Sequence, residues 1–329
     1  MWMKALRVIP RISKEEWTHL DLVSRWLVAS RAAVFIMTAL AGAIGGLMAY
    51  RDGHFSLSLF LLAIAGIVLA HATNNMLNDF VDHSRGVDKD NYYRSQYGPQ
   101  PLEHGLLTRA VFMNYIVITG LAACGIGIYL AYITGPWAWT IFGFGLFFLL
   151  FYTWPLKYIG LGEPAVVIVW GPLMVGGTYL VVSGGHWDSM VLLLSLVYSL
   201  GPTTVLLGKH TDKLAEDRVK KIGTLPVLIG QKAARYTTIL LWIIQYGFVI
   251  GLVVAGWLGF PMLIVLLAIP KLIGAIKIFL KPRPSAAPEG VEGENWPLYL
   301  VSHAFDYNRR FGLLFLLGLI LEVIMHKLM

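Results

Sequence analysis

Residues 55–90 read FSLSLFLLAIAGIVLAHATNNMLNDFVDHSRGVDKD, an apolar run that ends in amides and carboxylates. The run from 55 to about 80 exceeds the roughly 20 residues that a helix needs to cross a bilayer. Asn78 and Asp82 are four residues apart and therefore share one face of a helix. Asn75 and Asp79 form a second such pair. Carboxylates are costly in a membrane, so their position at one end of a predicted span indicates a functional site.

Composition assigns the whole chain to the membrane class. Of the 329 residues, 57% are apolar and only 14% are charged, against about 25% charged in a typical soluble chain. The single cysteine, Cys124, excludes an internal disulfide framework and a cysteine-based zinc or iron–sulfur site. The net charge of +7 indicates basic loops at an anionic membrane face, not a nucleic-acid partner. We therefore expect an integral membrane protein.

Nine apolar stretches are long enough to be spans, and no other class of element is indicated. They cover residues 25–50, 55–80, 107–133, 137–155, 163–183, 188–208, 234–256, 260–280 and 310–327. This pattern predicts an all-α polytopic protein whose residues 25–329 form a single bundle of nine transmembrane helices. Residues 1–24 are predicted to be an N-terminal cytoplasmic segment at the interface, in which Ser13 and Glu16 have the spacing of a capping box.

The basic residues fall almost entirely on one side of this topology. All but Arg31, Arg51 and Lys327, of the 26 Lys and Arg residues, lie in loops of the same side. The positive-inside rule makes that side the cytoplasm. The N-terminus is then cytoplasmic and the C-terminus outside. The long polar loops at 83–106 and 209–233 are cytoplasmic as well, so we expect the active site to face the cytoplasm.

A second acidic segment, GKHTDKLAEDR at 208–218, follows the sixth predicted span. Asp212 and Glu216 are four residues apart, Asp217 is adjacent, and Lys209 and Lys213 lie between or before them. Oxygen ligands without cysteine or paired histidine suit Mg²⁺, which binds through a few carboxylates and substrate phosphates. The lysines would clamp the same phosphates. The two segments predict a diphosphate leaving group on a substrate with a long apolar tail; the alternative is that both are merely solvated helix ends.

These segments resemble the UbiA superfamily of intramembrane prenyltransferases. NDFVDHSRGVD at 78–88 looks like its first aspartate-rich motif, and the Gly-Val-Asp spacing is closest to the 1,4-dihydroxy-2-naphthoate polyprenyltransferase branch. YTWPLKYIGLGE at 152–163 is similar to a segment of that branch, and DRVKKIGTLPV at 217–227 resembles the segment after the second motif. The resemblance runs from about residue 25 to 256. It implies a nine-helix bundle with a central cavity open to the cytoplasmic side.

The resemblance also implies substrates and site residues. The donor would be a polyprenyl diphosphate, the acceptor a small and usually aromatic quinone precursor, and the cofactor Mg²⁺. The residues expected to carry the chemistry are Asp82, Asp217 and Lys157. The residues expected to contact the diphosphate are Arg31, Arg94, Tyr152, Lys157, Lys209 and Lys213. The candidate metal ligands are Asn78, Asp79, Asp82, Asp88, Asp212, Glu216 and Asp217.

The sequence departs from the family pattern in the second motif. That motif usually has two aspartates four residues apart, the second followed by arginine. Counting back from Asp217, the earlier position is Lys213. Either Asp212 and Glu216 form the pair, or Asp217 is the ligand and a one-residue bulge brings Asp212 into line with it. We favour Asp217, because the Gly-Thr-Leu-Pro-Val run downstream fixes that register.

Several alternatives stay open at this point. Arg31 either reaches back to the interface or faces the cavity and meets phosphate. His71, seven residues before Asn78 on roughly the same face, is interpreted as a hydrogen-bonded packing residue. The acceptor is non-aromatic in some members of the superfamily, including those that transfer a phosphoribosyl group to a polyprenyl phosphate. A transporter is the rival from another class, although its site would lie near the midplane on broken helices.

Overall fold

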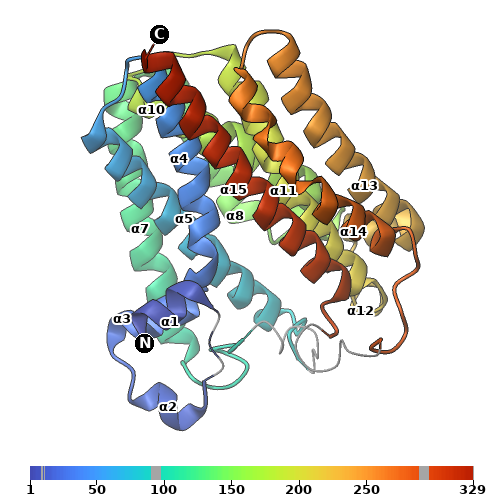
Figure 1. Ribbon diagram of the computed structural model, residues 1–329. Helices are drawn as coiled ribbons and strands as arrows, with labels where there is room; N and C mark the ends of the chain where they lie inside the picture. Colours follow the sequence, from blue (N-terminus) through green and yellow to red (C-terminus); the bar gives the residue numbers. More distant parts are fainter. Residues whose placement is uncertain (9, 11, 90–97, 289–295, 329) are drawn as a thin grey trace.

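The computed structural model describes residues 1–8, 10, 12–89, 98–288 and 296–328. Most of these residues are helical, and the long helices run side by side in one bundle (Figure 1). Within the described ranges, eight helical units are long and apolar enough to cross a membrane. The prediction of an all-α polytopic membrane protein is therefore confirmed.

The eight candidate spans follow one another along the chain, some of them built from consecutive helical pieces. They are η1 (Ala32–Val34) with α4 (Phe35–Arg51), α5 (Leu57–Ser84), α7 (Arg109–Thr134), the unit α9 (Gly162–Ile168)–η3 (Val169–Gly176)–α10 (Gly177–Val182), α11 (Ser189–Asp212), α13 (Leu225–Val254), η4 (Phe260–Ala268) with α14 (Ile269–Phe279), and α15 (Tyr299–Leu328). The shorter helices are α1 (Trp2–Arg7), α2 (Lys14–Thr18), α3 (Leu22–Ala29), α8 (Pro136–Phe151), η2 (Leu156–Tyr158) and α12 (Leu214–Val219).

The ninth predicted span, residues 137–155, corresponds to α8. This helix is apolar but has only 16 residues. At 1.5 Å per residue it is about 24 Å long, which is shorter than a hydrocarbon core of roughly 30 Å. The count of nine full spans therefore stays a prediction.

Two predicted boundaries are wrong. The first span was expected to start at residue 25, but α3 ends before Arg31, whose φ of 57° is left-handed and interrupts the helix. The ninth was expected from 310, whereas α15 starts at Tyr299 and continues through polar residues such as Asp306 and Asn308, which an apolar window rejects. The seventh was expected from 234; α13 covers Leu225–Val254 but is interrupted at Gly230, whose φ is 85°, so that its continuous part begins close to the predicted residue.

The N-terminal segment packs beneath the bundle. Its predicted capping box is confirmed: the Ser13 Oγ accepts a hydrogen bond from the Glu16 N–H at 3.1 Å, and Glu16 Oε2 accepts one from the Ser13 N–H at 2.8 Å. Trp17 is buried in a small core that includes Phe35 of α4 and Ala72 of α5. The segment is thus fixed to the bundle at the end where α4 begins (Figure 1).

Close helix packing holds the spans together. α11 contacts α9, η3, α13 and α15, and α15 also packs against α4, so that the last span closes on the first. A Cβ on Gly45 of α4 would lie 2.4 Å from the Val175 carbonyl oxygen of the π-helix η3. A Cβ on Gly171 of η3 would lie 2.9 Å from the Ser195 carbonyl oxygen of α11. Such contacts matter because lipid removes most of the hydrophobic force between helices.

The loops gather at two ends of the bundle. The acidic end is where α5 and α11 finish and α13 starts, and the far end is where α4 finishes and α11 starts. At the far end Tyr179 donates a hydrogen bond to Asp52 at 2.8 Å, and Arg51 Nε donates to the same carboxylate at 2.8 Å. Arg51 also lies 3.5 Å from Asp188, in the turn before α11. Arg51 is therefore paired with two carboxylates at the far end.

Candidate functional site

A cavity of about 540 Å³ lies inside the bundle. Its walls come from α4, α5, α7, α8, the α9–η3–α10 unit and α11. The charged side chains gather at the acidic end, and the rest of the lining is mostly small or apolar. The sequence-predicted residues that line it are Arg31, Asn78, Asp82, Asp88, Tyr152, Lys157, Lys209, Lys213 and Asp217. Arg94 lies outside the described residues.

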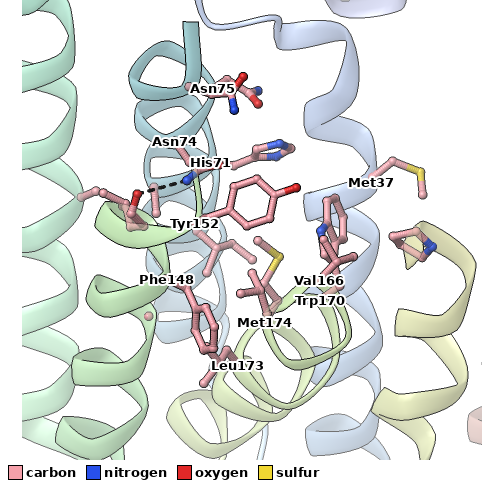
Figure 2. Close-up of a pocket in the computed structure, with 18 of the residues that line it drawn as sticks. Met37, His71, Asn74, Asn75, Phe148, Tyr152, Val166, Trp170, Leu173 and Met174 are labelled. Carbon is pink, nitrogen blue, oxygen red and sulfur yellow. Dashed lines mark hydrogen bonds between the residues drawn. The ribbon is translucent and has the colours of Figure 1, made fainter. Parts of the chain in front are cut away.

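One face of α5 supplies a polar stripe to this cavity. His71, Asn74, Asn75, Asn78 and Asp82 all line it, at spacings of three or four residues or their sums. Figure 2 shows the lower part of the stripe, with His71, Asn74 and Asn75 on one helix facing Tyr152 and Trp170. The pairing of Asn78 with Asp82 on one face is confirmed.

The amide groups of the three asparagines are held in place by hydrogen bonds. Asn74 Nδ2 donates to the Leu149 carbonyl at 3.1 Å, and Asn75 Nδ2 donates to the Ser30 carbonyl at 2.9 Å. Asn78 Nδ2 donates to the Thr153 hydroxyl at 3.1 Å. These contacts fix the orientation of each amide and leave its side-chain oxygen able to accept from or coordinate a ligand.

Asp82 and Lys157 form a buried pair across the cavity. The Lys157 ammonium donates to both carboxylate oxygens of Asp82, at 2.8 Å each. Lys157 is held by η2, where its N–H donates to the Tyr152 carbonyl at 2.9 Å. Asp88 is also buried and lines the cavity; it follows Gly86, whose φ of 69° turns the chain after α5. Lys157 thus meets Asp82, 75 residues away in sequence, at the acidic end, where Asp88 also lies.

Arg31 and Asp79 form an ion pair beside this group. Arg31 lines the cavity and Asp79 does not. The helix break at Arg31 directs its side chain inward, so the alternative in which it reaches back to the interface is wrong. Asp79, a candidate metal ligand, is buried against Arg31, because its position on α5 is one residue round from Asn78.

The second acidic segment contributes Lys209, Lys213 and Asp217 to the cavity. Lys213 and Asp217 lie 3.3 Å apart as an ion pair. The other oxygen of Asp217, Oδ2, is buried and has no hydrogen-bond partner among the described residues. Glu216 lies next to it but does not line the cavity. Partial burial raises the pKa of Glu216, against the opposing effect of Lys213 and Lys220.

The structure gives Asp212 a different position from the one expected. Its oxygens accept hydrogen bonds from the N–H groups of Leu300 and Val301 and from Arg283 Nε, at 3.0 Å each. These contacts join the end of α11 to the start of α15, where a carboxylate satisfies amides that a helix cannot pair internally. α11 ends at Asp212 and α12 starts at Leu214, but this break does not turn Asp212 into line with Asp217. Asp212 therefore lies away from the cavity, against the prediction of a metal ligand.

A further buried pair was not predicted. His210 Nδ1 and Glu163 Oε1 are 2.7 Å apart, and Glu163 Oε2 accepts a hydrogen bond from the Leu225 N–H at 3.4 Å. His210 lines the cavity. Glu163 thereby joins α9, α11 and α13. Both residues stand inside the segments singled out from the sequence, but a contact between positions 47 residues apart leaves no local pattern.

The oxygen atoms of this site suit a cation shared with a phosphate. Asn78, Asp82, Asp88 and Asp217 offer amide or carboxylate oxygens to one cavity. Within the described part of the chain, no three His, Cys, Asp or Glu side chains converge closely enough to hold a metal ion by themselves. Mg²⁺ does not need such a cage, since it usually binds one or two carboxylates together with waters and substrate phosphates. The unpartnered buried oxygen of Asp217 fits the same role.

Comparison with known sequences gives one consistent result. Residues 35–291 match the model of the UbiA prenyltransferase family. The UbiA prenyltransferase domain-containing protein 1 homologue of Drosophila melanogaster is 28% identical over 231 residues, which are 67% of this chain and 62% of that protein. The 1,4-dihydroxy-2-naphthoate octaprenyltransferase of Escherichia coli is 26% identical over 220 residues, 64% of this chain and 70% of that protein. The chain spans slightly less than two thirds of the length of the first relatives that it matches.

Comparison with solved structures agrees on the fold. A UbiA homologue from Aeropyrum pernix superposes with a TM-score of 0.66 at 19% identity, covering 87% of this chain and 96% of that one. A UbiA homologue from Archaeoglobus fulgidus, bound to DMAPP and Mg²⁺, gives a TM-score of 0.55 at 15% identity, covering 88% and 98%. These similarities extend over nearly the whole of the solved chains.

Proposed function

Since this chain belongs to the UbiA prenyltransferase family, we propose that it transfers a polyprenyl group from an isoprenyl diphosphate to a small aromatic acceptor. The observation that carries the proposal is the convergence of Asn78, Asp82, Asp88, Lys157 and Asp217 at one end of a cavity whose remaining walls are mostly small or apolar. A diphosphate with a long hydrocarbon tail needs both environments in one ligand site. The octaprenyltransferase named above acts, by its name, on such a pair of substrates.

The chain's own residues would bind the diphosphate and stabilise its departure. Lys157, Lys209 and Lys213 line the acidic end and supply positive charge. As the bond between C1 and the diphosphate oxygen breaks, the electron pair stays on that oxygen, and these cations stabilise the growing negative charge. Lys157 is already oriented by Asp82, with both carboxylate oxygens 2.8 Å from its ammonium group.

Mg²⁺ is the cofactor that the site residues support. The residues that would hold it are Asn78, Asp82, Asp88 and Asp217. Such an ion would supply positive charge that stabilises the departing diphosphate. The Archaeoglobus fulgidus homologue holds DMAPP together with Mg²⁺, which supports the same pairing here.

The apolar part of the cavity would hold the tail and shield the allylic carbon. Tyr152, Phe148 and Trp170 surround the space below the acidic end (Figure 2). Aromatic faces attract a cation without reacting with it as a strong nucleophile does. The acceptor then forms its new carbon–carbon bond to C1 and releases a proton.

The expected orientation completes the proposal. The charge bias of the loops favours the acidic end in the cytoplasm, with the N-terminus on that side and the C-terminus outside. Both substrates would then be drawn from the cytoplasmic leaflet and the cytoplasm. The chain would act on a lipid-dissolved donor without releasing it from the membrane.

The test is product formation by the purified full chain in lipid nanodiscs. With Mg²⁺, labelled geranylgeranyl diphosphate and 1,4-dihydroxy-2-naphthoate, a prenylated product of the expected mass should form. Asp82→Ala should reduce its rate by at least about 10³-fold, because the lost charge stabilisation is worth several kcal/mol. The matched control is Asp306→Ala, since Asp306 forms an exposed ion pair with Lys271 and does not line the cavity. A normal rate in Asp82→Ala, or the lack of any diphosphate turnover in the unmodified chain, would contradict the proposal.

A further inference from the structure

His71 stands apart from the diphosphate-binding end of the cavity. It is on α5, seven residues before Asn78, and therefore about 10 Å deeper along the helix axis. Its ring lines the cavity, and its Nδ1 is 2.6 Å from the Thr38 hydroxyl of α4. A polar ring at this depth in a membrane is costly, so it calls for a reason beyond packing.

The contact with Thr38 determines which ring nitrogen carries the proton. Thr38 Oγ1 has no second hydrogen-bond partner among the described residues, so its proton is satisfied only by donation to Nδ1 of His71. A neutral imidazole that accepts at Nδ1 carries its proton on Nε2. In the other tautomer the buried hydroxyl would be left without an acceptor. His71 therefore presents an N–H donor, not a basic lone pair, to the cavity.

The surroundings of Nε2 limit which groups can accept a hydrogen bond from its N–H. The Trp170 ring stands edge-on to the imidazole at 5.6 Å between centroids, and Phe35 lies at 5.8 Å on another side. Figure 2 shows Tyr152 and Phe148 across the same space. In the described part of the chain Nε2 has no hydrogen-bond partner. A prenyl tail has no atom that accepts a hydrogen bond, and a buried N–H without an acceptor is unfavourable.

We infer that His71 is a specificity-determining residue for the acceptor: its Nε2–H donates to a hydroxyl oxygen on an aromatic ring held between Trp170 and Tyr152. This inference rests on the proposed function and adds the chemical class of the second substrate. The ring faces of the acceptor match the aromatic walls, and its hydroxyl supplies the missing hydrogen-bond acceptor. Thr38 is the positioning residue that fixes the tautomer.

The inference is tested by acceptor binding without turnover. The probes are 1,4-dihydroxy-2-naphthoate and 2-naphthoate, which share ring and carboxylate and differ in the ring hydroxyls. Binding to the full chain in nanodiscs is measured anaerobically by equilibrium dialysis. The unmodified chain should bind the hydroxylated ring about tenfold more tightly, the effect of one hydrogen bond. In His71→Leu the ratio of the two affinities should fall to about one, because only the hydroxylated ring binds more weakly.

Two further variants separate a specific contact from a packing role. His71→Gln keeps an N–H donor and should retain part of the preference for the hydroxylated ring. Thr38→Val should lower that preference, because the imidazole proton is then no longer held on Nε2. Asp306→Ala, an exposed position that does not line the cavity, should leave it unchanged. Mg²⁺-dependent binding of geranyl diphosphate should be the same in all variants, which verifies that they are folded.

The outcomes distinguish this inference from the proposed function. Equal weakening of both rings in His71→Leu would make His71 a packing residue and overturn the inference. Binding of neither ring by the unmodified chain, with diphosphate binding intact, would overturn the inference and leave the donor chemistry standing. Loss of Mg²⁺-dependent diphosphate binding in the unmodified chain would instead refute the proposed function.

Discussion

Asp212 and Asp217 lie five residues apart and have different surroundings. Asp212 accepts three hydrogen bonds from α15 and Arg283, whereas Asp217 lines the cavity with one oxygen unpartnered among the described residues. Glu216, next to Asp217 in the sequence, does not line the cavity. The surroundings of these three acidic residues therefore predict three different roles: a structural one for Asp212, a site role for Asp217 and none in the site for Glu216.

We expect the three to respond differently to loss of charge. Asp217→Asn should reduce product formation by at least about 10²-fold, because it removes a charge from the site. Glu216→Gln should leave the rate within about twofold. Asp212→Asn should keep most of the rate but lower the free energy of unfolding by about 1–3 kcal/mol, since charged acceptors of backbone N–H groups are lost. The measurements are initial rates against Mg²⁺ concentration and thermal unfolding in detergent; an inactive Glu216→Gln with an active Asp217→Asn would reverse the assignment.

The buried pair of Asp82 and Lys157 allows a separate test of stability and catalysis. Lys157→Met should lower the free energy of unfolding by about 3–5 kcal/mol, because it leaves the Asp82 carboxylate buried and unpaired. Lys157→Met combined with Asp82→Asn should recover much of that loss, since no uncompensated charge remains. Neither variant should form product. Recovery of product formation along with stability in the double variant would contradict a role of these charges in the site.

At the scale of elements, the π-helix η3 is the piece on which the bundle closes. It lies between α4 and α11, and Gly45 and Gly171 allow backbone contact on its two sides. The widened turns of a π-helix are frequent at functional sites, and here the element carries Trp170 and Met174 into the cavity. Its position thus depends on two residues that have no side chain.

Gly45→Ala is expected to show this dependence. The added methyl group would lie 2.4 Å from the Val175 carbonyl oxygen, so η3 must shift, at a cost of about 1–3 kcal/mol in stability. Gly125→Ala on α7 is the matched control, because its Cβ would meet nothing within 4 Å, and it should be neutral or slightly stabilising. Thermal unfolding of both variants checks the difference. Equal unfolding midpoints for the two variants would mean that η3 shifts without a loss of stability.

Hydropathy predicted which segments become helices but not how they end. α15 continues through polar residues such as Asp306, which an apolar window rejects, and α13 is interrupted at Gly230, whose φ of 85° leaves no trace in hydropathy. The left-handed turn at Arg31 carries no local signal, since arginine is not typical there. At the site, residues on one stripe of α5 were predictable from spacing. The partners of Asp79 and Asp212 were not, because each contact joins positions 48 or 88 residues apart that only the assembled bundle brings together.

For the whole molecule, the orientation in the membrane is the quantity to measure. In a chain with Cys124→Ala, single cysteines are placed at Val219 of α12 and at Trp187, which are exposed at the acidic end and the far end respectively. The charge bias predicts that Val219→Cys reacts with an impermeant thiol reagent only from the cytoplasmic side. Trp187→Cys should react only from the opposite side. The reverse labelling would place the acidic end outside and contradict the proposed orientation.

The far end has a consequence for the membrane as an electrical barrier. Ala131, Ala138 and Leu180 form an apolar floor beneath the cavity, and beyond it Arg51 and Asp52 neutralise each other. A site that attracts cations and anions would otherwise offer ions a path along the transmembrane voltage, where each charge moved through 100 mV releases about 2.3 kcal/mol. We expect the floor to block such a path, so that the purified chain in sealed vesicles leaves an imposed proton gradient intact.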